Sequence, residues 1–211
     1  GSAPSNQTKT HGVDLTLSDR GTLVRTGYTF VEWNTASDGS GTSYAESASY
    51  TNNANLDLFA IWTADTYTIT FEGNGNTGGT DPADQTKTYG VDLTLSDQGT
   101  LVKTGYTFSG WNTAADGSGT SYAAGATYSV ESGATLYAQW TADTYTVTYD
   151  GNGFTGGSAP SNQTKTHGVD LTLSDKGTLV RTGYTFVEWN TASDGSGDSY
   201  AESASYTNNA N

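Results

Sequence analysis

Residues 73–78 have the spacing of a phosphate-binding loop. They read Gly-Asn-Gly-Asn-Thr-Gly, and backbone amides at this G-x-G-x-x-G spacing hold the phosphates of a dinucleotide. That function needs a helix directly after the loop and a βαβ unit around it. Thr80, Asp81 and Pro82 follow instead. Because Gly-Asn-Gly is also common turn chemistry, we predict a turn here, with no bound nucleotide or other cofactor.

His11 and His167 are the two imidazole groups that could act as a general base or as a metal ligand. The position that corresponds to both in the middle part of the chain is Tyr89. A reaction that needs imidazole would therefore be missing there, and no serine lies in a nucleophile-elbow sequence. We predict a protein that is not an enzyme, in which the histidines are half-exposed aromatic side chains.

Acidic turns offer candidate sites for a weakly held cation. Calcium needs six or more oxygen ligands at set spacing, and the EF-hand spacing is absent. Glu46, which could complete a set of ligands, is replaced by Ala124 in the middle copy. Asp-Gly is also a frequent hairpin turn, which we expect to be its role here. The candidates, for weak cation binding only, are Asn34, Asp38, Asp116 and Asp194.

Three recurring lysines could form isopeptide crosslinks, which need a buried lysine beside an asparagine and a carboxylate. Lys9, Lys87 and Lys165 recur a few residues after Asn6, Asp84 and Asn162. Each lysine lies in a polar Gln-Thr-Lys-Thr segment, and lysine is almost never fully buried unless it is paired. We therefore predict solvated lysines.

The composition excludes several classes of partner. Acidic residues outnumber basic ones by 22 to 8, and the formal net charge is -14. Nucleic acids and anionic membrane surfaces are bound by clustered Lys and Arg, so we expect neither partner. Without a run of about 18 apolar residues, no membrane insertion is expected within these residues, and any export or anchoring signal would lie outside them. The 12% aromatic residues argue for small folded cores rather than disorder.

An internal repeat organises the chain. Tryptophans recur at a spacing of 78 residues, and residues 1–55 match 157–211 except at positions 20 and 42 of the first copy. We therefore predict three copies in an A-B-A pattern. The first, 1–62, lacks its first strand; the second, 67–140, is complete; the third, 145–211, lacks its last strand. Thr-Ala-Asp-Thr segments at 63–66 and 141–144 are predicted to link the copies.

Alternating apolar residues predict strands in the complete copy. The expected strands are 67–71, 91–95, 106–111 and 136–140, with a bulge near Gly110. Short helices or 3₁₀ turns are expected within 96–104, with Leu101 and Val102 facing inward, and near 123–126. The predicted core residues are Trp33, Trp62, Trp111, Trp140, Trp189, Tyr106 and Phe108.

Three strings of residues in the repeat resemble a known family. They begin at Tyr145 (Tyr-Thr-Val-Thr-Tyr-Asp-Gly-Asn-Gly), at Gly105 (Gly-Tyr-Thr-Phe-Ser-Gly-Trp-Asn) and at Ala134 (Ala-Thr-Leu-Tyr-Ala-Gln-Trp). This combination is similar to the Listeria–Bacteroides repeat, also called the internalin B-repeat. The resemblance implies tandem β-grasp-like domains on secreted or surface-anchored bacterial proteins, without catalytic residues. Glu32 and Glu188 depart from it, because the motif has Gly there.

We therefore expect a mainly β, tandem array of β-grasp-like domains that is extended and lies on the outside of a bacterial cell. The leading functional hypothesis is a stalk that projects another domain, with neighbouring repeats of the same chain as partners. The alternative is an adhesin segment that binds a host surface protein or a glycan through several weak contacts. The partial copies are also expected to expose edges that a strand from another chain could cover.

Overall fold

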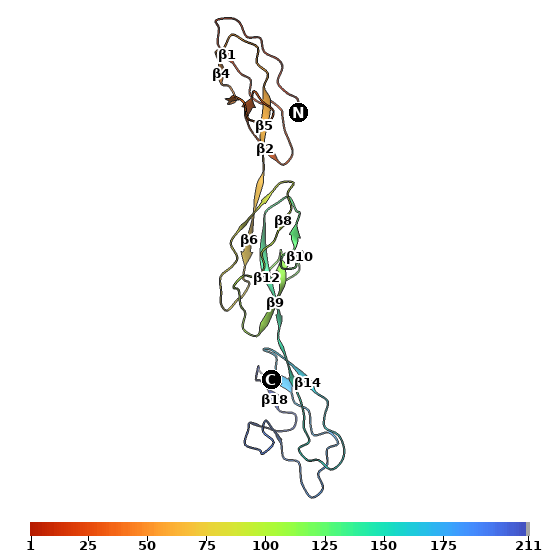
Figure 1. The fold of residues 1–211 in the computed structure, drawn as a ribbon. Coiled ribbons are helices and arrows are strands. Elements are labelled where there is room, and N and C mark those ends of the chain that lie inside the picture. Colours follow the sequence, from red (N-terminus) through yellow and green to blue (C-terminus); the bar gives the residue numbers. More distant parts are fainter. Residues whose placement is uncertain (210–211) are drawn as a thin grey trace. The chain divides into compact units, whose positions relative to one another are not determined.

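The computed structural model describes residues 1–209, and these fold entirely as β-strands, turns and loops (Figure 1). The mainly β class is confirmed, whereas the prediction of short helices or 3₁₀ turns within 96–104 and near 123–126 is wrong, because neither is present there. Leu101 is buried as predicted, but Val102 is exposed, and its backbone pairs with Gly78 instead. Among the described residues no helix is long and apolar enough to cross a membrane.

The first repeat contains five strands. They are β1 (Leu15–Thr16), β2 (Tyr28–Asn34), β3 (Ser43–Tyr44), β4 (Ser49–Tyr50) and β5 (Phe59–Ala64). Strands β3, β2 and β5 form one sheet in that order, and β1 pairs with β4. All of these pairs are antiparallel. The long strands β2 and β5 thus form most of the sheet, and each of the other three strands has only two residues.

The middle repeat has the fullest set of strands. They are β6 (Thr66–Glu72), β7 (Gln85–Thr88), β8 (Leu93–Thr94), β9 (Tyr106–Asn112), β10 (Ser121–Tyr122), β11 (Thr127–Tyr128) and β12 (Ala134–Ala142). One sheet has the order β10-β9-β12-β6-β7, and β8 pairs with β11. Three of the predicted strands are present at nearly the expected bounds, but only Leu93–Thr94 remains of the segment 91–95.

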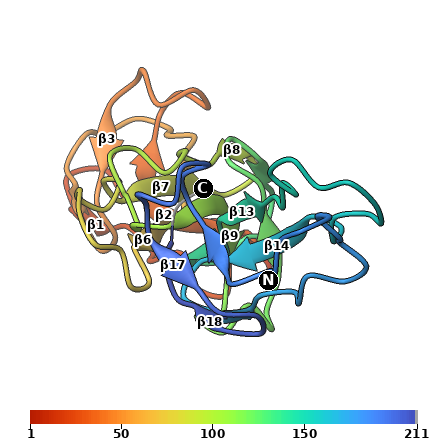
Figure 2. The same cartoon turned by 90° about the horizontal axis from the view of Figure 1, so that it is seen from below.

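The third repeat has shorter strands. They are β13 (Thr144–Val147), β14 (Gln163–Thr166), β15 (Leu171–Thr172), β16 (Trp189–Asn190), β17 (Ser199–Tyr200) and β18 (Ser205–Tyr206). Among the described residues they form three separate pairs: β13 with β14, β15 with β18, and β16 with β17. The pair β13–β14 can be followed in Figure 2.

By contact density, the described residues divide into two compact units, and the division passes through the middle repeat. The first unit contains residues 1–71, 83–96 and 124–136, and the second contains 72–82, 97–123 and the described residues from 137 onward. The joint between the first two repeats therefore lies inside the first unit, and the joint between the last two lies inside the second.

The predicted bulge is present in strand β9. Gly110 pairs with Gln139 and Phe108 pairs with Trp140, so Ser109 is the additional residue on β9. The first repeat has the same irregularity between Phe30 and Glu32 of β2. An additional residue lets side chains on either side of the bulge face the same side of the sheet. This is why the aromatic residues in this strand are out of phase with simple alternation.

Candidate functional site

The strands run almost without interruption from one repeat into the next. Strand β5 ends at Ala64 and β6 begins at Thr66, so only Asp65 lies between them. Strand β12 ends at Ala142 and β13 begins at Thr144, so only Asp143 lies between those two. The four-residue linkers expected at 63–66 and 141–144 are therefore not separate segments, because all their other residues belong to strands.

Asp65 is bound to both of the repeats that it joins. Its N–H donates to the carbonyl oxygen of Gly27 in the first repeat at 2.9 Å, and its carbonyl oxygen accepts from the N–H of Tyr89 in the second repeat at 2.9 Å. Its carboxylate also accepts a 2.7 Å hydrogen bond from the Thr29 hydroxyl. The side chain and both backbone groups of this single residue thus hold the junction.

Asp143 repeats this arrangement 78 residues later. Its N–H donates to the Gly105 carbonyl at 2.9 Å, and its carbonyl accepts from the His167 N–H at 2.8 Å. Its carboxylate accepts from the Thr107 hydroxyl at 2.8 Å. We call these two places the Asp65 joint (Gly27, Tyr28, Thr29, Asp65, Tyr89) and the Asp143 joint (Gly105, Tyr106, Thr107, Asp143, His167).

An aromatic contact accompanies each joint. In the Asp65 joint the rings of Tyr28 and Tyr89 are 5.6 Å apart and edge-on, and the Arg25 guanidinium carbon lies 3.8 Å from the centre of the Tyr28 ring. Edge-on ring pairs and cation–π contacts of this kind are attractive. A β-carbon added to Gly27 would lie 2.3 Å from the Tyr89 ring, so glycine is required at that position.

In the Asp143 joint, His167 takes the place of Tyr89. The His167 ring is 5.4 Å from that of Tyr106, over which the Lys103 ammonium lies at 4.8 Å. A β-carbon on Gly105 would lie 2.0 Å from the imidazole. The half-buried His167 thus acts as an aromatic packing residue, as the sequence predicted, whereas His11 is exposed.

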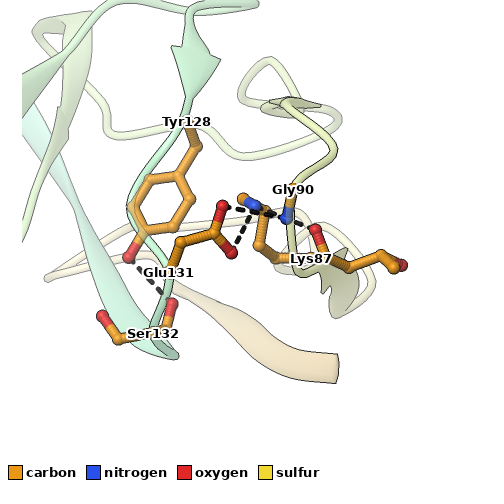
Figure 3. Close-up of polar contacts among 6 residues, drawn as sticks. Lys87, Gly90, Tyr128, Glu131 and Ser132 are labelled. Atoms are coloured by element: carbon orange, nitrogen blue, oxygen red, sulfur yellow. Dashed lines mark hydrogen bonds and ion pairs between the residues drawn. The ribbon is translucent and has the colours of Figure 1, made fainter. Parts of the chain in front are cut away.

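Lys87 is completely buried, which contradicts the solvated lysine expected from the sequence. Its ammonium donates to the Thr88 carbonyl at 2.9 Å and to Glu131 Oε2 at 3.0 Å, and Glu131 Oε1 accepts from the N–H of Gly90 at 3.0 Å (Figure 3). Lys87–Glu131 is the single salt bridge among the described residues. The hydrogen bond from Lys87 lowers the pKa of Glu131 from its ordinary value.

Lys165 is also buried, but its partner is neutral. It donates to the Thr166 carbonyl at 2.9 Å and to Asn209 Oδ1 at 3.0 Å, and this oxygen also accepts from the Gly168 N–H at 2.9 Å. Asn209 therefore takes the place of Glu131. Lys9, which is half-buried, makes the same bond to Asn53 at 3.2 Å. The neighbours considered in the sequence, Asn6, Asp84 and Asn162, are not the partners.

The proposed cation candidates form the framework of the hairpin loops. Asn34 is buried, and its side chain bonds the backbone of Gly39 and Gly41 in the loop. Asp38 accepts from the N–H and hydroxyl of Ser40 at 3.0 and 2.7 Å. Equivalent Asx turns hold the other two loops. The hydrogen bond from the serine hydroxyl of each turn is the main cause that lowers the pKa of its aspartate from the ordinary value. These aspartates are Asp38, Asp116 and Asp194.

These loop oxygens thus already have donors within their own turns. Within residues 1–209 no group of three or more His, Asp or Glu side chains is arranged to hold a metal ion. The turn interpretation of the acidic loops agrees with this geometry. The sequence Gly73–Gly78 also forms a turn, in which the Asn74 amide donates to the carbonyls of Ala115 and Ala138 at 2.8 Å.

Most of the predicted core aromatics lie on the long strands β2, β5, β9 and β12, whereas Trp189 lies on the two-residue strand β16. Trp111 is fully buried and Trp33 is 7% exposed, while Trp62, Trp140 and Trp189 are half-buried. Edge-on contacts join Phe108 to Trp111 and Trp140 at 5.1 and 5.6 Å. Tyr106 is half-buried, and its ring belongs to the Asp143 joint rather than to the core.

The sequence could not reveal the joints or the buried lysines. The lysine partners lie 44 residues further along the chain, as Asn53, Glu131 and Asn209 do. Each joint needs a glycine, an aspartate and an aromatic residue from three separate segments. The one available signal was the recurrence of Gly27, Gly105 and Gly183 at the repeat spacing.

Nearly the whole chain matches one family. The model of the Listeria-Bacteroides repeat domain matches residues 1–61, 67–139 and 145–211. The chain is therefore a tandem array of bacterial surface-protein repeats, and it belongs to the Listeria-Bacteroides repeat family, which confirms the resemblance seen in the sequence. The β-grasp-like arrangement within each repeat stays a prediction.

Two curated relatives come from Evansella cellulosilytica. A protein whose name describes it as a Gly-rich membrane protein is 39% identical over 178 residues, which are 82% of this chain and 20% of that protein. Another, whose name describes it as a membrane protein, is 35% identical over 156 residues, or 74% of this chain and 22% of that protein. The chain thus spans about one fifth of the length of these relatives. No solved structure matches it.

Proposed function

We propose that these repeats are a non-catalytic spacer of a bacterial cell-surface or secreted protein, and that they project another domain away from the cell. The observation that supports this most strongly is the Asp65 joint and its equivalent at Asp143. In both, the last strand of one repeat is separated from the first strand of the next by a single residue, and that residue bonds both repeats. A junction of this kind limits bending and leaves no flexible linker between domains.

The strand order of the middle repeat favours the same role. The chain enters this repeat on β6 and leaves it on β12, and these two strands are neighbours in the sheet. Their side chains also meet, because the Thr70 hydroxyl donates to that of Thr135 at 3.0 Å. A pull along the chain would therefore load hydrogen bonds between adjacent strands rather than unfold a loop.

The exposed surface fits a spacer better than an adhesin. The large apolar residues that are exposed in all three repeats are two valines per repeat, and no exposed aromatic residue recurs in this way among the described residues. Protein–protein interfaces are enriched in aromatic residues relative to the rest of the surface. The recurring valines are Val13, Val91 and Val169, and Val24, Val102 and Val180.

Small-angle X-ray scattering on arrays of one, two and three A-B pairs tests the spacer proposal. The maximum dimension is expected to increase by an equal step with each added pair. Matched arrays with Asp65→Gly and Asp143→Gly at every joint are expected to be shorter on average, because they lose the carboxylate bond and gain backbone freedom. A maximum dimension that grows only slightly with pair number would overturn the proposal.

A further inference from the structure

Strands β6 and β12, which are neighbours in the sheet of the middle repeat, run in the same direction. A β-carbon added to Gly133, just before β12, would lie 2.9 Å from the Thr68 carbonyl oxygen, so the two backbones meet there. Two residues further along both strands, the Thr70 hydroxyl donates to the Thr135 hydroxyl at 3.0 Å. Because the residue numbers of the partners increase together, the two strands are parallel.

Contacts near the other end of the same strands show the same direction. The Trp140 indole N–H donates to the Gly73 carbonyl at 2.9 Å, and the Asn74 amide donates to the Ala138 carbonyl at 2.8 Å. Gly73 and Asn74 directly follow β6, and their partners lie at or beyond the middle of β12. The start of β6 therefore meets the start of β12, and the residues after β6 meet its later part.

The parallel direction determines where the chain enters and leaves this pair of strands. It enters at Thr66, the first residue of β6, and leaves at Ala142, the last residue of β12. In two parallel neighbours these residues lie at opposite ends of the pair. Only Asp65 and Asp143 separate them from the strands of the adjacent repeats, so tension along the chain reaches the pair without first extending a loop.

Tension applied to opposite ends of the pair acts along the strands. The hydrogen bonds between neighbouring strands run across the strands, so a load along the strands shears all of them together. A load applied to both strands at the same end would instead open these bonds one after another. Separation of β6 from β12 by tension along the chain therefore requires many bonds to break in one event.

Buried side chains on both strands add to this resistance. Ile69 on β6 and Leu136 and Ala138 on β12 are fully buried, and Phe71 on β6 is 4% exposed. If one strand slid along the other, these side chains would leave the positions in which they are packed and expose apolar area to water. The side-chain hydrogen bonds described above would have to break in the same movement.

We propose that β6 and β12 form a mechanical clamp, through which the middle repeat bears tension along the chain by shear. A spacer needs only length, whereas a clamp also keeps the repeat folded while the projected domain is pulled. As a role at the cell surface this rests on the proposed spacer function, but the resistance of the clamp belongs to the repeat itself. The two can therefore be tested separately.

Single-molecule force spectroscopy on the 211-residue chain tests the clamp, with pairs of introduced cysteines as handles because the chain has none. T66C with T141C loads the strands from opposite ends, and T66C with S132C loads them from the same end; all three positions are exposed. Neither pair places the first or the third repeat under load.

The unfolding force at equal pulling speed is expected to be at least about twofold higher for the opposite-end pair, because forced unfolding follows the barrier of the loaded structure. Equal forces in the two geometries would overturn the proposal. Small-angle scattering on the arrays of repeat pairs measures length without load, so a failed clamp is distinguishable from a failed spacer.

Asn74→Gly, measured in both geometries, is the matched variant. Asn74 has a φ of 50°, which glycine adopts readily, so the substitution removes the amide without straining the backbone. The opposite-end force is expected to fall by at least about a quarter, since the hydrogen bonds to Ala115 and Ala138 are lost. The same-end force should stay unchanged, because these bonds lie far from the loaded end. An equal fractional loss in both geometries would reject the clamp.

Discussion

The first and third repeats form a natural controlled comparison. Their sequences are nearly identical, but among the described residues the first includes its closing strand β5 without an opening strand, whereas the third includes its opening strand β13 without a closing one. The burial of equivalent side chains differs according to which of these strands lies beside them. Trp33 is buried beside β5 while Trp189 is half-buried, and Lys165 is buried beside β13 while Lys9 is half-buried. Burial here is set by neighbouring strands rather than by local sequence.

Tryptophan replacement at equivalent positions tests this comparison with the largest expected effect. Trp33→Ala is expected to lower the free energy of unfolding by about 3–5 kcal/mol, since a buried aromatic side chain is lost. Trp189→Ala is expected to cost roughly 1–2 kcal/mol, because less apolar area leaves water at that position. Urea denaturation followed by far-ultraviolet circular dichroism measures both. Equal losses at the two positions would contradict the dependence on the covering strand.

Replacing Gly27, and separately its counterpart Gly183, by alanine tests the Asp65 joint. Gly27 and Gly183 both have positive φ, 73° and 79°, so alanine at either should cost about 1–2 kcal/mol. Only at Gly27 would the new β-carbon also collide with the Tyr89 ring, for a further ~1–3 kcal/mol. Thermal denaturation gives the two losses, and the NMR signals of Tyr89 should shift only in Gly27→Ala. A shift of similar size in Gly183→Ala would argue against the joint contact.

The A and B repeats differ in the partner of the buried lysine, which predicts different responses to pH. The pKa of Glu131 is lowered in the folded chain, so its pair with Lys87 stabilises the B repeat above the unfolded pKa of about 4.3. That stability is lost as the pH falls through the lower folded value. In the third repeat the partner of the lysine is the neutral Asn209, which has no carboxylate to protonate.

Unfolding curves between pH 7 and pH 3, recorded for the chain and for Glu131→Gln, measure this difference. The chain is expected to lose stability in acid more steeply than Glu131→Gln, because the variant has no carboxylate to protonate at that position. Superimposable pH profiles would show that the pair contributes nothing to the B repeat. Asn209→Gln is the matched control, and its profile should follow that of the unaltered chain.

The acidic turns are expected to give the smallest effect. Asp194→Asn keeps an Asx side chain that can accept from Ser196, so stability should change by less than about 0.5 kcal/mol. Because the loop oxygens already have donors, millimolar calcium is expected to leave the thermal midpoint of both forms unchanged. A calcium-dependent rise that disappears in Asp194→Asn would restore the cation site considered from the sequence.

The sequence predicted the features that depend on short spacing. The 78-residue recurrence of tryptophan located the repeats, and the alternation around Ile69 and Leu136 located two of the long strands. It failed where distant segments decide the structure. Leu101 and Val102 resembled an inward-facing helical pair, but the backbone of Val102 pairs with Gly78. Lysine burial was missed because it depends on a partner 44 residues away.

The continuity of the joint is the central claim, and a distance between spin labels on its two sides tests it most directly. The chain has no cysteine, so T51C in the first repeat and D92C in the second introduce two exposed labelling sites. Pulsed electron paramagnetic resonance is predicted to give one narrow distance distribution, which broadens when Asp65→Gly is added. A broad distribution in the chain with Asp65 intact would contradict the joint, and with it the spacer.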